Sequence, residues 1–288
     1  MNNTTSILMF ALALAPFGLA QTVQTPQSPY VWTTIDVAGA GWSAAIGINS
    51  EGQVVGYAMV GTKYQGFEYS DGSFVNIDIP GKDMTHAWAI NARGDVVGCA
   101  HNNGQPCRGY LVSKGEYTAV QPDGAIESWA YGINPRGDIV GYYIDASKVQ
   151  RGFLFSLGAF TSINVPGARS TRAQGINSRG QIAGSFTDAA NVNHGFLFSE
   201  GMFTTIDLPS PGTTVQYLTI NPQGDLAGVF NDAAGTHGFV IRAGNLSTID
   251  FPGAKWTHVH GLNAAGEIAG MYGDQAGKTH GYGLLLPR

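Results

Sequence analysis

The sequence predicts an all-β protein that folds as a six-bladed β-propeller, with each blade a four-stranded antiparallel sheet. Three observations lead to this prediction. The chain repeats one pattern six times, at intervals of 42 to 44 residues. Each copy holds four short stretches of strand-forming residues separated by turns, which is the content of a propeller blade. The first copy is preceded by one extra strand-like stretch, and the last copy lacks its fourth.

Three groups of anchor residues define the repeat. An asparagine begins an N-x-x-G turn in every copy, at Asn49, Asn91, Asn134, Asn177, Asn221 and Asn263. A glycine followed by an aromatic residue comes next, at Gly66, Gly109, Gly152, Gly195, Gly238 and Gly281. A pair such as Ile-Asp ends the copies, at Ile35, Ile77, Val120, Ile163, Ile206 and Ile249. The three groups keep the same order and spacing, which chance does not produce.

The turn residues separate the strands within each copy. The N-x-x-G turn joins a first strand to a second of the kind "QVVGY", because Asn bonds its own backbone and Gly adopts positive φ. The third strand is of the kind "HGFLFS" and the fourth of the kind "FTTIDLP". The extra stretch, residues 31–37, is expected to complete the last blade, which would leave no open sheet edge. A non-closed β-solenoid of six stacked hairpin pairs is the alternative.

The chain is interpreted as a single exported domain. A short apolar stretch at residues 7–15 is followed by small residues before Gln21. Residues 1–20 are therefore predicted to be a signal peptide, 21–30 a linker and 31–288 the propeller, with a buried helix as the alternative for the first segment. No apolar run approaches the roughly 20 residues that span a bilayer. We expect a secreted or periplasmic protein.

The composition narrows the class of partner. Charged residues make up 12% of the chain, hydrophobic residues 43%, and the formal net charge is −5. The chain is thus globular rather than disordered, and the lack of a Lys/Arg cluster argues against nucleic-acid binding. The 41 glycines fit a fold with frequent turns. We expect a monomer without a cofactor, whose partner is a small molecule, a glycan or a protein.

Two cysteines flank a predicted hairpin loop. Cys99 and Cys107 enclose "AHNNGQP", so they would lie on facing strands. Such a pair can meet the Cα separation of about 5.5 Å that a disulfide requires. A local disulfide is the favoured interpretation in an exported protein. A pair of reduced thiols is the alternative.

Two sequence features resemble the HAF-type probable extracellular repeat family. They are the pattern "GINxxGxIVG" and an aromatic residue after His-Gly, the latter at His194, His237 and His280. The family more often has Ala in the middle of this triplet, so the chain departs from the pattern there. The resemblance covers residues 33–288. It implies an extracellular β-repeat protein and no particular activity.

Functional residues are expected where the six copies differ on a constant scaffold. The fifth and third positions before the anchor asparagine vary most, and in a propeller they lie at the mouth of the central channel. The predicted ligand-binding residues are His86, Trp88, Trp129, Tyr131, Arg172, Gln174, His258 and His260. Gln216 and Leu218 fill these positions in the fifth copy, and Trp42, Tyr217 and Trp256 are expected nearby. Aromatic and hydrogen-bonding side chains together suit sugars, peptides or other flat ligands.

Three functions are compatible with this pattern. The first is a binding or interaction module for a glycan, a peptide or a small molecule. The second is a propeller-type lyase or lactone hydrolase that uses His86, His258 or Tyr131 as acid or base. The third is a purely structural surface repeat, in which the varied residues fill the channel by packing on one another.

No metal site is predicted. His86, His258 and His260 have a suitable residue type, but the second and sixth blades are separated by the first. The histidine of the His-Gly-aromatic triplet is replaced by Arg or Gln in other copies, so we interpret it as a hydrogen-bonding residue. In five copies the loop between the second and third strands carries a polar residue four positions after the glycine of the second strand, at Asn102, Asp145, Asp188, Asp232 and Asp274. A single acid in each loop is typical of a turn former.

Overall fold

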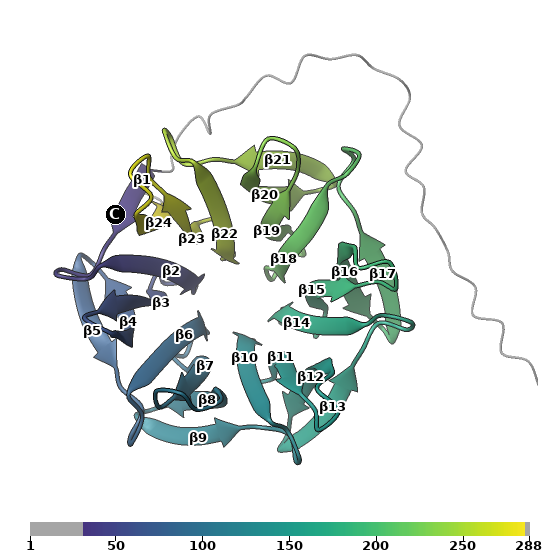
Figure 1. Ribbon diagram of the computed structural model, residues 1–288, viewed down its shortest axis with the longest axis horizontal. Helices are drawn as coiled ribbons and strands as arrows, with labels where there is room; N and C mark the ends of the chain where they lie inside the picture. Colours follow the sequence, from purple (N-terminus) through teal and green to yellow (C-terminus); the bar gives the residue numbers. More distant parts are fainter. Residues whose placement is uncertain (1–30, 286–288) are drawn as a thin grey trace, which may run out of the picture.

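Residues 31–285 of the computed structural model form a closed ring of six four-stranded antiparallel sheets (Figure 1). The predicted fold class is therefore confirmed, and the solenoid alternative is wrong. The predicted signal peptide and linker, residues 1–30, lie outside the described residues. Within the described part of the chain, no helix is long and apolar enough to cross a membrane.

Each blade runs from an innermost strand at the channel to an outermost strand at the rim. The innermost strands are β2 (Trp42–Ile48), β6 (Met84–Ile90), β10 (Glu127–Ile133), β14 (Ser170–Ile176), β18 (Thr214–Ile220) and β22 (Trp256–Leu262). The second strands are β3 (Val54–Val60), β7 (Val96–His101), β11 (Ile139–Ile144), β15 (Ile182–Thr187), β19 (Leu226–Asn231) and β23 (Ile268–Gly273).

The outer half of each blade is built in the same way. The third strands are β4 (Lys63–Ser70), β8 (Arg108–Ser113), β12 (Gln150–Ser156), β16 (Asn193–Ser199), β20 (Thr236–Arg242) and β24 (Thr279–Leu285). The outermost strands are β5 (Ser73–Ile77), β9 (Glu116–Val120), β13 (Ala159–Ile163), β17 (Met202–Ile206), β21 (Asn245–Ile249) and β1 (Val31–Ile35).

The first strand closes the ring, as the sequence predicts. β1 pairs antiparallel with β24 and completes the sheet β1-β24-β23-β22 (Figure 1). The last blade therefore contains both ends of the described chain. Because this pairing satisfies the edge of β24, the blade exposes no more unpaired backbone than the other five.

In each blade, the glycine of the second strand and the aromatic residue of the third strand form one packing unit. Gly141 of β11 pairs directly with Phe153 of β12, and Phe153 is 1% exposed. A Cβ on Gly141 would overlap both the Phe153 ring and the carbonyl oxygen of Trp129. The equivalent aromatic residues of the other blades are also at most 2% exposed: Phe67, Tyr110, Phe196, Phe239 and Tyr282. Each blade thus needs the glycine so that its large core ring can lie flat against the sheet.

The anchor asparagines form a continuous ring where the innermost strands end, which we call the asparagine ring. Each Nδ2 donates a hydrogen bond to the backbone carbonyl oxygen of the next asparagine around the propeller, at 2.8 to 3.3 Å. The bond from Asn263 to Asn49 closes the circle. All six side chains are buried, at 1 to 4% exposed. The repeat therefore fixes both the turns and the contacts between blades.

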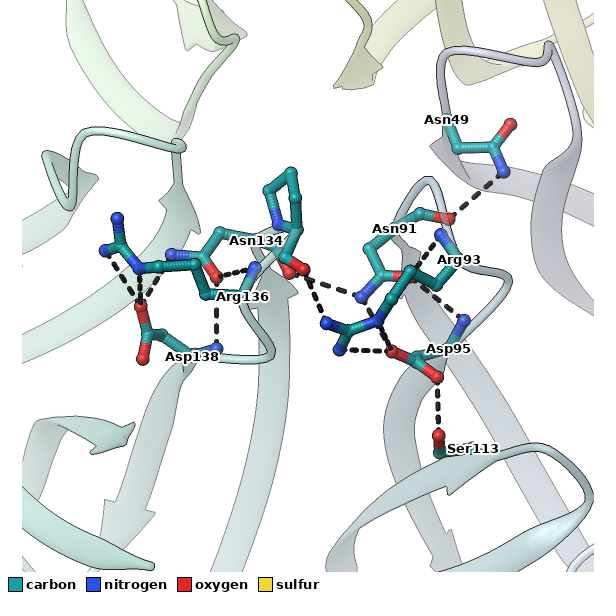
Figure 2. Close-up of polar contacts among 9 residues, drawn as sticks. Asn49, Asn91, Arg93, Asp95, Ser113, Asn134, Arg136 and Asp138 are labelled. Carbon is teal, nitrogen blue, oxygen red and sulfur yellow. Dashed lines mark hydrogen bonds and ion pairs between the residues drawn. The ribbon is translucent and has the colours of Figure 1, made fainter. Parts of the chain in front are cut away.

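Local contacts hold each anchor asparagine in place. Asn91 Oδ1 accepts hydrogen bonds from the backbone N–H groups of Arg93 and Asp95, and its Nδ2 also donates to Asp95 (Figure 2). The Arg93 guanidinium bonds Asp95 and reaches across to the Pro135 carbonyl of the next blade, at 2.6 Å (Figure 2). Every polar atom of the Asn91 amide consequently has a partner.

Candidate functional site

A β-bulge interrupts the pairing of each innermost strand with the second strand of its blade. In five blades the bulged residue is the third before the anchor asparagine: Ile46, Trp88, Tyr131, Gln174 and His260. A bulge adds one unpaired residue and redirects its side chain. The variable position identified in the sequence is therefore the position that the backbone frees from regular pairing.

The fifth copy differs from the sequence prediction. In β18 the bulge falls at Gln216, two residues earlier than in the other blades. Leu218 is consequently turned into the core between blades, where it is fully buried, and the Tyr217 side chain faces the channel instead. The assignment of Leu218 to a variable channel position is thus wrong for this blade.

The predicted site residues come together around the channel axis. Trp88 contacts Tyr131, with ring centroids 4.3 Å apart, and lies 6.1 Å from both Trp129 and His260. His258 is 5.6 Å from His260. His86 joins the same network through Trp129, at 5.8 Å. Side chains from three blades thus touch each other across the channel, which is the packing expected for residues that fill its interior.

The two remaining predicted residues take different positions. Gln174 is 3% exposed, and its Oε1 accepts a hydrogen bond from the Leu218 backbone N–H at 3.1 Å. Arg172 is exposed at the mouth, with its guanidinium carbon 5.7 Å from the centre of the Tyr142 ring and its Nε bonded to Gln150. Among the predicted site residues, Arg172 is therefore the one that places a positive charge in solvent at the channel mouth.

Sequence reasoning missed the aromatic residues of the second and third strands. Tyr57 of β3 and Tyr64 of β4 lie against His86, at 4.7 and 4.6 Å between ring centroids. Tyr142 of β11 stacks near Trp129 and Tyr131, at 6.0 and 5.6 Å. For Tyr57 and Tyr142 the signal was available, because the residue directly after the "VVG"-type glycine pairs with the fifth position before the asparagine.

A cavity of about 80 Å³ lies between the bulged side chains and the asparagine ring. Its walls are the last residues of the innermost strands, including Trp88, Tyr131, Gln174, Tyr217 and His260. At roughly 30 Å³ for each water, a cavity of this size holds about three water molecules. None of the residues at the fifth position before the asparagine contributes to it.

Two residues that line the cavity carry buried polar atoms that have no partner. Trp88 Nε1 and both ring nitrogens of His260 are inaccessible to solvent and make no hydrogen bond within residues 31–285. His260 is only 8% exposed. A buried donor or acceptor left unpaired costs about 1–3 kcal/mol. These three atoms are the strongest indication that the cavity receives a polar molecule.

Burial keeps the channel histidines neutral. Desolvation lowers the pKa of His86 to about 4, with the nearby His101 adding to the shift, and lowers the pKa of His258 to about 4. The pKa of His260 falls well below its usual value for the same reason, with a further contribution from His258. Burial raises the pKa of Tyr131 well above its usual value. Side chains that titrate so far from pH 7 are weak proton donors or acceptors there, which does not favour the lyase or hydrolase alternative.

The histidines of the repeated triplet stay outside the channel. The histidines of the three triplets donate a hydrogen bond from Nδ1 to an aspartate carboxylate, at 2.7, 3.0 and 2.6 Å: His194 to Asp207, His237 to Asp250 and His280 to Asp36. These aspartates belong to the Ile-Asp anchors, so two anchor groups of the repeat meet here. The interpretation of the histidines as hydrogen-bonding blade residues is confirmed.

The loop acids act as turn formers, as predicted. Asp145 Oδ1 accepts hydrogen bonds from the Ser147 and Val149 backbone N–H groups, both at 2.9 Å. Asp188 binds the next turn in the same way, through Ala190 and Val192 at 2.8 Å. Such bonding within a turn accounts for one acid in each loop without a cation.

The two cysteines form a disulfide beside the channel mouth. Cys99 and Cys107 are bonded, with Cα atoms 5.7 Å apart, which confirms the local disulfide predicted from the sequence. Both are buried. His86 and His101 lie next to them, and one nitrogen of each lies within 4.8 Å of the other and of Cys107 Sγ.

Comparison with known proteins identifies similar folds but no family. No protein family and no curated protein sequence matches this chain. A putative TolB from Agrobacterium tumefaciens aligns over 91% of this chain and 92% of that one, at 12% identity and a TM-score of 0.56. The Aleuria aurantia lectin in complex with Fucα1-6GlcNAc aligns over 88% and 94%, at 10% identity and a TM-score of 0.51. A catalytically inactive virginiamycin B lyase from Staphylococcus aureus with quinupristin covers 88% of each chain, at 15% identity and a TM-score of 0.50. At these identities the likeness concerns the fold alone.

Proposed function

We propose that the protein is an exported propeller of the HAF repeat type that binds a small hydroxylated molecule, such as a sugar, in its central channel. The observation that carries the proposal is that two residues of the cavity wall, Trp88 and His260, carry buried ring nitrogens without a hydrogen-bond partner. The apolar N-terminal stretch and the disulfide between the only two cysteines support export.

The chemistry of the wall selects a neutral ligand with both donors and acceptors. Trp88 Nε1 only donates, whereas a neutral His260 ring offers one donor and one acceptor. A hydroxyl group satisfies either kind of partner. A charged ligand is disfavoured, because a lone buried charge costs several kcal/mol and the surrounding histidines are neutral.

The size of the site favours a small polyol or one edge of a sugar ring. The cavity has room for about three waters and is bordered by Trp88, Tyr131 and Tyr217. Aromatic faces contact the apolar faces of sugar rings, while hydroxyl groups reach the polar atoms. Glycan binding also occurs on a fold of this kind in the Aleuria aurantia lectin.

A calorimetric screen with matched variants tests the proposal. The mature protein is titrated with monosaccharides and polyols, and the ligand that binds is then titrated into His260→Phe and Trp88→Phe. Both variants keep an aromatic ring and remove the unpartnered polar atoms, so we expect binding to weaken at least tenfold while the melting temperature stays the same or rises. His194→Phe, which lies on an outer strand, is the control that retains wild-type binding.

Two results would contradict the proposal. One is the absence of binding by any sugar or polyol in the screen. The other is binding that survives His260→Phe but is lost in Trp129→Ala and Arg172→Ala, since that would place the ligand on the exposed mouth predicted from the sequence and not in the cavity.

A further inference from the structure

Four side chains that can bind a metal ion meet at the mouth of the blade formed by β6 to β9. His86 comes from β6, Cys99 and His101 from β7, and Cys107 from the residue just before β8. The pairing of β6 with β7 places His86 directly opposite Cys99. His86 Nδ1 lies 3.8 Å from Cys99 Sγ, and the rings of His86 and His101 stack with their centroids 5.6 Å apart.

The donor atoms are close to the spacing of a tetrahedral site. One nitrogen from each histidine and Cys107 Sγ all lie within 4.8 Å of one another, and Cys99 Sγ is bonded to Cys107. Zinc–sulfur bonds of about 2.3 Å and zinc–nitrogen bonds of about 2.0–2.1 Å place tetrahedral donors about 3.3 to 3.8 Å apart. Small rotations of these side chains, with the two sulfurs moving apart, would reach that geometry.

The histidine tautomer is suited to metal binding. His101 Nδ1 lies 3.1 Å from the backbone carbonyl oxygen of Asn102. Because a carbonyl oxygen only accepts, this contact places the proton on Nδ1 and leaves the lone pair of Nε2 available. A ligating histidine commonly has its other nitrogen held by a carbonyl in this way.

We propose that the Cys99–Cys107 disulfide masks a zinc site with two cysteine and two histidine ligands, which opens when the disulfide is reduced. In the disulfide, neither sulfur is a thiolate, and the thiolate is the form that binds metal. A dithiol reductant supplies two electrons and two protons, so the S–S bond breaks, two thiols form and the reductant becomes a disulfide. Zinc then displaces the two thiol protons into solvent and is held by both sulfurs, His86 and His101. Oxidation by a disulfide reverses the sequence and releases the zinc.

The site is placed to affect the channel. His86 contacts Tyr57, Tyr64 and Trp129 as well as the disulfide. A metal bound to its ring would draw His86 toward β7 and away from those aromatic side chains. The redox state of one pair of cysteines would in this way change the packing of side chains at the channel mouth.

Cobalt binding tests the inference on the intact mature protein. Co²⁺ is titrated into the oxidised protein and into protein reduced with a phosphine, and the thiolate-to-cobalt charge-transfer band and the visible bands of tetrahedral cobalt are followed. We expect one equivalent of Co²⁺ to bind to the reduced protein and to be displaced by Zn²⁺. The oxidised protein should show neither band. Near-ultraviolet circular dichroism on the same samples shows whether the reduced protein keeps its fold.

Histidine variants separate this site from simple thiol binding. His86→Phe and His101→Gln keep both cysteines, and each should weaken Co²⁺ binding at least tenfold, while His237→Gln on an outer strand of another blade should bind as the wild type does. The inference is overturned if the oxidised protein binds equally well, if both histidine variants bind like the wild type, or if cobalt binds only to reduced protein that has lost its near-ultraviolet spectrum.

Discussion

Replacing one residue of the asparagine ring should destabilise the whole propeller. Asn134 is 1% exposed, and its side chain makes four hydrogen bonds, of which Figure 2 shows those with Arg136 and Asp138. Its Nδ2 donates to the Asp138 carboxylate at 2.8 Å and to the Asn177 carbonyl of the next blade at 3.3 Å. Its Oδ1 accepts from the backbone N–H groups of Arg136 and Asp138, at 2.9 and 3.0 Å. Asn134→Ala removes all four.

The loss can be estimated from these contacts. A neutral hydrogen bond contributes about 0.5–1.5 kcal/mol to the free energy of unfolding, and one to a charged group about 1.5–3 kcal/mol. Three bonds of the first kind and one of the second amount to about 5 kcal/mol. Water reaching the partly exposed Asp138 will recover some of this. We therefore expect Asn134→Ala to lower the free energy of unfolding by about 3 to 5 kcal/mol.

Urea unfolding measured by tryptophan fluorescence checks this value. The midpoint should fall while the slope stays unchanged, since the surface exposed on unfolding is the same. Asn76→Ala, an asparagine exposed on the outermost strand β5, is the matched control and should change the free energy of unfolding by less than about 0.5 kcal/mol. A loss for Asn134→Ala below about 1 kcal/mol would refute the view that the ring holds the blades together.

Three further predictions follow from the disulfide and the buried ionisable groups. Reducing Cys99–Cys107 in the presence of a chelator should lower the free energy of unfolding by about 2.5 kcal/mol, because the disulfide no longer restricts the loop between two cysteines that are 8 residues apart in the unfolded chain. A double Cys→Ser variant should not respond to the reductant. The free energy of unfolding should also fall as the pH drops from 6.5 to 4, because His258 takes up its proton at a higher pH in the unfolded chain than in the folded protein. This one group accounts for about 3 kcal/mol of the change. His258→Gln should therefore flatten that part of a plot of the urea midpoint against pH. Burial raises the pKa of Asp138, but hydrogen bonds from a serine, an asparagine and an arginine outweigh it and hold the pKa below 3.8. The contribution of Asp138 to the free energy of unfolding is therefore present above that pH and is lost as the pH falls through the folded-state pKa. An acid-unfolding curve for Asp138→Asn that matched the wild type would contradict this assignment.

The sequence alone determined the number of blades, the order of their strands and the closure of the ring. A propeller is built from local antiparallel hairpins, so every strand pairs with a neighbour in the chain except β1, and the missing strand of the last copy identified that partner. The variable positions around the channel were found for the same reason. Side chains that differ between copies of a constant backbone stand out when the copies are aligned, as Trp88 and His260 did.

Only the tertiary structure decided which of these residues line the cavity and which pack elsewhere. Because the β18 bulge lies at Gln216, Tyr217 faces the channel in place of Leu218. Such a one-residue change of register cannot be recognised from the repeated sequence pattern. The unpaired state of His260 depends on what six strands place around it. The four possible metal ligands likewise meet only because β6 and β7 pair and a disulfide draws the following loop back to them. The scaffold can be predicted from the spacing of residues along the chain. A site depends instead on distances between strands, which are set only when the ring closes.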